Sequence, residues 1–124
     1  MFAGDISKWV VTSVTDMGSM FWGASAFDGD LSNWDTSNVI NMRAAFSYAA
    51  KFNGDISSWI TSNANNMAYM FRGTLNFNAD LSRWDSSAVT TMTHSKWGEI
   101  SLFLLYCLCL QIFIFFFFFS FFCC

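Results

Sequence analysis

The feature that most constrains how this chain can fold is a repeat of 25 residues over positions 2 to 98. Four copies begin at Phe2, Phe27, Phe52 and Phe77, and the fourth copy is incomplete. A unit of this length cannot bury its own apolar face, so successive copies have to stack and share a continuous core. The sequence therefore predicts a repeat solenoid of about four copies in residues 1–98.

Residues of one type recur at fixed positions of the repeat, and each set of residues at 25-residue spacing forms a column. Such columns are formed by phenylalanine, aspartate, an aliphatic residue, tryptophan, a small apolar residue and methionine. We expect these columns to be structural and to align along the stack. In the second copy they comprise Phe27, Asp30, Leu31, Trp34, Val39, Met42 and Phe46, and in the third Phe52, Asp55, Ile56, Trp59, Met67 and Phe71.

The hydrophobic pattern changes its period within each copy. Met17, Met20, Phe21 and Ala24 follow the i, i+3, i+4, i+7 spacing of one helix face. The preceding segment, which runs from Asp5 to Trp9 in the first copy, is too short and too β-leaning for a helix. We therefore predict a leucine-rich-repeat-like α/β fold with one short strand and one short helix per copy.

The aspartate column is the best candidate for a metal site. Asp5, Asp30, Asp55 and Asp80 would form a ladder of carboxylates able to attract Ca²⁺. Calcium, however, needs six to eight oxygens converging on one point, and one carboxylate per copy does not provide them. The favoured alternative is that each aspartate caps a local turn. We predict no metal and no other cofactor.

Two further groups of residues admit a functional interpretation. The tryptophan column could recognise a carbohydrate or a protein, although a large residue repeated in every copy is more typical of packing. His94, the only histidine, stands beside Ser95 and upstream of Cys107 and Cys109. No third partner for a nucleophile-base pair or a metal site accompanies them. We expect no catalytic residues and no enzymatic activity.

Charge separates the chain into two unlike parts. The net charge of -3 argues against a nucleic-acid partner. Every charged residue lies at or before Glu99, and residues 100–124 are uncharged and rich in phenylalanine. The segment 99–124 is predicted to be a hydrophobic helix or a disordered tail. As a helix, residues 100–124 would be about 37 Å long and could span a membrane. The alternative is that it is translated noncoding sequence, because phenylalanine has T-rich codons.

The repeat resembles that of a known class of proteins. The segment from Phe27 to Phe46, which contains Asp30, Leu31 and Trp34, resembles the repeat of the BspA-type leucine-rich-repeat surface proteins. More narrowly, it resembles a repeat family of unknown function from mycoplasma surface lipoproteins. The resemblance covers about residues 2–98 and implies a solenoid at a cell surface, with recognition or adhesion roles and no enzymatic activity. The chain departs from that class in showing no signal or lipobox cysteine and only four copies.

Together these observations predict a non-enzymatic recognition or adhesion module at a membrane or cell surface. Its partner would be an unknown protein or glycan on the exposed face of the solenoid, with a membrane contact through residues 100–124. Two alternatives remain open. The chain could be a truncated gene-model fragment with no independent function, or a cytosolic protein-binding scaffold solenoid.

Overall fold

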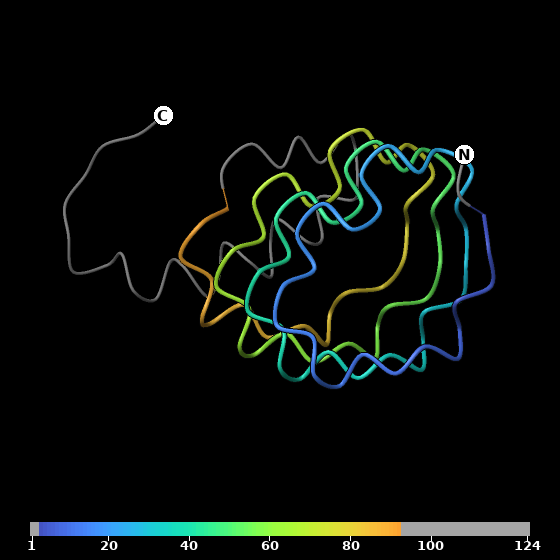
Figure 1. Cartoon of the computed structure of the whole chain (residues 1–124). Coiled ribbons are helices and arrows are strands. Elements are labelled where there is room, and N and C mark those ends of the chain that lie inside the picture. Colours follow the sequence, from blue (N-terminus) through green and yellow to red (C-terminus); the bar gives the residue numbers. More distant parts are fainter. Residues whose placement is uncertain (1–2, 93–124) are drawn as a thin grey trace, which may run out of the picture.

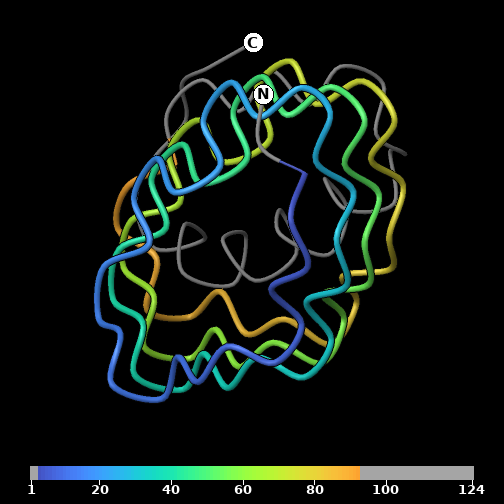
Figure 2. The same cartoon turned by 45° about the vertical axis from the view of Figure 1, so that its right-hand side comes forward.

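The computed structural model describes residues 3–92 of the chain. The chain winds through successive coils that lie side by side, from blue in the first copy to orange in the fourth (Figure 1). In the view of Figure 2 the coils lie one behind another with closely similar outlines. We call residues 3–26, 27–51, 52–76 and 77–92 coils 1 to 4. Residues one repeat apart therefore become neighbours along the stack.

The predicted strand-plus-helix copies are wrong. Residues 3–92 contain no helix, and their only β pairing consists of isolated one-residue bridges. These parallel bridges join Asp16 to Asn41, Asn41 to Asn66, and Asn66 to Thr91. Each coil is otherwise a succession of turns. The leucine-rich-repeat-like α/β class does not describe this fold.

The helix expected at Met17–Ala24 fails because its backbone bonds to the next coil. Alternate amides, those of residues 17, 19, 21 and 23, donate to carbonyls of coil 2, with Phe21 N to Ala45 O at 2.8 Å. Between them, i to i+3 turns such as Ala24 N to Phe21 O at 3.1 Å bend the chain. Ser19 at φ 57° and Gly23 at φ 67° are left-handed, which a right-handed helix excludes. Successive i to i+3 turns give nearly the spacing of a helix, which explains the misleading pattern.

The strand expected at Asp5–Trp9 is a pair of overlapping turns. The carboxylate of Asp5 accepts the backbone N–H of Ser7 at 3.0 Å, and Trp9 N donates to Ile6 O at 3.0 Å. The same two bonds recur in coils 2, 3 and 4. Aspartate favours such local bonds to the backbone over a ladder between strands, so this segment turns instead of extending.

The core is a ladder of stacked aromatic rings. Phe46 of coil 2 stacks on Phe52 of coil 3 at a centroid distance of 4.1 Å, and Phe52 stacks on Phe77 of coil 4 at 5.8 Å. Trp34 and Trp59 stack at 6.3 Å with an interplanar angle of 3°. Of the column residues named from the sequence, those that are buried in one continuous core are Phe27, Leu31, Trp34, Val39, Met42, Phe46, Phe52, Ile56, Trp59, Met67 and Phe71. Their burial supplies the main driving force for stacking, at roughly 1.5–3 kcal/mol per large side chain.

The predicted transmembrane helix, and the membrane or cell-surface location inferred from it, are also corrected. In the part of the chain that the structure describes, no helix is long and apolar enough to cross a membrane. The hydrophobic segment 99–124, on which that prediction rested, lies outside the described residues.

Candidate functional site

Each aspartate of the column caps a local turn, as the turn-cap interpretation predicted. Asp30 and Asp55 each accept the backbone N–H of the serine two residues later, both at 2.9 Å. Bonds from the serine N–H and side chain lower the pKa of both carboxyls, and the same holds for Asp5 and Asp80. Among residues 3–92, no group of three or more acidic, histidine or cysteine side chains could hold a metal ion. The column therefore shapes the coils.

The tryptophan column joins each coil to the one before it. The indole N–H of Trp34 donates to Ile6 O at 3.1 Å, and that of Trp59 donates to Leu31 O at 3.0 Å. Both side chains are buried. Trp9, in the first described coil, has no such bond and is 54% exposed. The column is thus used for packing and does not form a recognition stripe.

A row of asparagine amides joins the coils on another side of the stack. Asn38 Nδ2 donates to Thr12 O and Asn63 Nδ2 donates to Ser37 O, each at 2.7 Å. One donor of each amide is fixed in this way, so each side chain is held in a single orientation while remaining exposed. The amide oxygens accept none of the hydrogen bonds found among the described residues, which leaves them open to a ligand.

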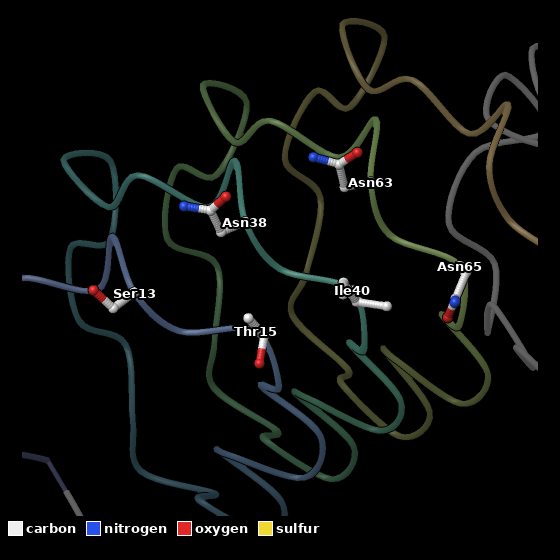
Figure 3. A pocket seen from close by; sticks show the side chains of 6 residues that line it. All are labelled: Ser13, Thr15, Asn38, Ile40, Asn63 and Asn65. Carbon is white, nitrogen blue, oxygen red and sulfur yellow. The ribbon is translucent and has the colours of Figure 1, made fainter.

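These amides line an open groove of about 590 Å³. Figure 3 shows its walls as two rows that cross the coils. One row contains Ser13, Asn38 and Asn63, and the other contains Thr15, Ile40 and Asn65. None of the six side chains is charged, and Ile40, 45% exposed, is the one apolar member. The groove therefore offers uncharged hydrogen-bonding groups from three coils around a single apolar side chain, that of Ile40.

The backbone in one row of the groove is already paired between coils. Ile40 N donates to Thr15 O at 2.8 Å, and Asn65 N donates to Ile40 O at 2.9 Å. Asn65 O in turn accepts the N–H of Thr90 at 2.8 Å. An added peptide strand needs unpaired backbone groups at an edge, and this row does not supply them. Ligand contacts along this row must therefore come from side chains.

Sequence reasoning missed all six groove residues. The signal was present, because Ser13, Asn38 and Asn63 are small polar residues at 25-residue spacing. It does not distinguish a polar turn from a ligand-binding row, since only the stacking of coils brings the members of a row together. His94, Cys107 and Cys109, which were weighed as a nucleophile-base pair or metal site, lie outside the described residues.

Comparison with known proteins places the chain in a family. The fold is a stack of turn-rich 25-residue coils with an uncharged groove on its surface. These features define the class of the protein as a repeat protein, in which the regular surface follows from the repeat. The chain belongs to the family described as "Mycoplasma protein of unknown function, DUF285", whose model matches residues 1–99. No curated protein and no solved structure matches the chain.

Proposed function

We propose that this protein is a non-enzymatic recognition module and that its groove binds a neutral glycan. The observation that carries the proposal is the composition of the groove, in which amide and hydroxyl side chains surround the exposed Ile40 without any charge. Sugars present hydroxyls that both donate and accept, and C–H faces that pack on apolar side chains. Ligand sites generally combine an apolar surface with a few well-placed polar groups.

Two further features favour a glycan over a peptide strand. The backbone of the row from Thr15 to Asn65 is paired between coils, which excludes strand addition along that row. The rows repeat with the coils, which suits a ligand built from repeating units. The resemblance of the repeat to BspA-type proteins, for some of which recognition roles have been suggested, agrees with this function.

The experiment is titration of the full chain with neutral linear oligosaccharides, namely maltohexaose, cellohexaose and chitohexaose. Calorimetry would give the affinity, and NMR shifts of the amides of Ile40 and Asn65 would locate the site. We expect at least one oligosaccharide to bind and Ile40→Asp to weaken that binding about tenfold or more, because the carboxylate is left unpaired under the sugar.

The matched control is Ile60→Asp. Ile60 is 49% exposed, like Ile40, but does not line the groove. The control should bind as the unaltered chain does. Absence of binding to the whole panel, or an equal loss in both variants, would contradict the proposal.

A further inference from the structure

Two arginines and two tyrosines form a cluster on a different part of the surface. The guanidinium carbon of Arg43 lies 5.3 Å from the ring centroid of Tyr69. That of Arg72 lies 5.4 Å from the Tyr48 ring and 5.8 Å from the Tyr69 ring. Both arginines are exposed, so Tyr69 lies within cation-π distance of two charges that face solvent.

The two tyrosines of the cluster adopt a backbone conformation that is unfavourable for residues with a side chain. Tyr48 and Tyr69 both have φ of 60°, in the left-handed region that disfavours residues with a Cβ by roughly 1–2 kcal/mol. Glycine occupies the column of Tyr48 in coils 1 and 3, at Gly23 and Gly73. A Cβ on Gly73 would come within 2.7 Å of the Tyr48 ring, so the glycine leaves room for it. The left-handed conformation recurs in both columns, at Ser19 and Ala44 and at Gly23 and Gly73, so it belongs to the turn of the coil. That turn leaves the Tyr48 side chain 44% exposed.

Charge is segregated around the coil. We call residues 17–26, 42–51 and 67–76 the basic arc. It contains Arg43, Lys51 and Arg72 and no acidic residue, whereas every aspartate of the described residues lies elsewhere on the coil. Within residues 3–92, neither arginine of the cluster forms an ion pair. In a chain of net charge -3, this is a local positive surface, and residues 3–92 supply no acidic partner for it.

We propose that this Arg–Tyr cluster binds an acidic peptide segment of a partner protein. A guanidinium stacked on a ring keeps the N–H groups of its edge available, and these match a carboxylate in bidentate fashion. The two guanidiniums share the Tyr69 ring, so they are close enough for carboxylates of one short segment. The same arc also exposes Trp22 (63%) and Met20. Arginine, tyrosine, tryptophan and methionine are the residues that protein interfaces enrich, which favours a peptide over a sulfated glycan.

This site is separate from the groove, and its test is independent of glycan binding. The probe is a rhodamine-labelled hexaglutamate peptide, added to the full chain at low ionic strength and followed by fluorescence anisotropy. We expect saturable binding that weakens as salt is added. Arg72→Gln should weaken binding about tenfold or more, because a charged hydrogen-bonding partner is lost. Arg72→Lys should weaken it by less, since it keeps the charge and loses the planar stacking.

Arg83→Gln is the matched control. Arg83 is also exposed, lies outside the basic arc beside Asp80, and its replacement changes the net charge equally. It should alter the affinity less than about twofold, and a hexaglutamine peptide should not bind. The proposal is overturned if Arg83→Gln weakens binding as much as Arg72→Gln does. It is equally overturned if hexaglutamate does not bind or if only dextran sulfate binds. Unchanged thermal unfolding of the variants shows that any loss is not caused by misfolding.

Discussion

Single residues with a left-handed backbone make the coil turn as it does. Gly23 and Gly73 occupy the same column, with φ of 67° and 69°. Around Gly23 no atom lies within 4 Å of where a Cβ would stand, whereas at Gly73 that Cβ would meet the Tyr48 ring at 2.7 Å. The two glycines therefore share one backbone requirement and differ in their surroundings.

This difference gives a prediction for two alanine variants. Gly23→Ala should lower the free energy of unfolding by about 1–2 kcal/mol, which is the cost of the left-handed backbone alone. Gly73→Ala should cost about 1 kcal/mol more, because the Tyr48 ring must also move. Urea unfolding of both variants measures this. Adding Tyr48→Ala to Gly73→Ala should remove the extra cost, and equal stabilities of the two single variants would refute the steric argument.

At the scale of the element, each coil is built from turns where the sequence pattern predicted a strand and a helix. The tryptophans of coils 2 to 4, buried or partly buried, stabilise the turns, because each indole N–H donates to a carbonyl of the preceding coil. Among the described residues, every buried side-chain nitrogen or oxygen has a hydrogen-bond partner. A coil without regular secondary structure depends on such bonds, since its backbone groups must be satisfied between coils.

Replacing one of these tryptophans tests that dependence. Trp59→Phe keeps a ring in the stack and removes the indole N–H that donates to Leu31 O at 3.0 Å. Leu31 O then keeps only its bond from Trp34 N within the coil, at 3.1 Å. We expect a loss of about 0.5–1.5 kcal/mol in the free energy of unfolding, because one hydrogen bond between coils is removed. Trp9→Phe is the control, because Trp9 is exposed and makes no such bond, and it should change stability by less than about 0.5 kcal/mol. Equal effects in thermal or urea unfolding would show that ring size, rather than the hydrogen bond, sets the stability.

The whole molecule is a stack in which each coil is stabilised by its neighbours. Phe46 illustrates this, since its ring stacks on Phe21 of coil 1 at 5.2 Å and on Phe71 of coil 3 at 5.6 Å. Its backbone N–H donates to Met70 O at 2.9 Å, and Ala45 O accepts from Phe21 N. In such a stack, stability is a sum of coil and interface contributions.

We therefore predict that Phe46→Ala acts beyond its own coil. The variant should lose about 3–5 kcal/mol of stability. Amide hydrogen exchange should become faster at residues 17–23 of coil 1 as well as at 42–48 of coil 2, because both sets donate across coil interfaces. Faster exchange confined to coil 2 would contradict a nearest-neighbour stack.

The sequence by itself determined which residues are inside. A repeat of 25 residues places Phe27 on Phe52 and Trp34 on Trp59 whatever path the backbone takes between them, because identical side chains align when identical units stack. It also determined the turn at each aspartate, since the bond from Asp30 to the N–H of Ser32 is local.

Only the tertiary structure decided the backbone path and the two candidate sites. The residues from Met17 to Ala24 carry a helical pattern, but every second N–H group pairs with coil 2, and no local signal reports a partner 24 residues away. The groove and the Arg–Tyr cluster likewise join side chains from different coils, such as Arg43 and Tyr69. Spacing along the chain fixes which residues share a column, whereas the shape of each coil fixes which columns meet at the surface.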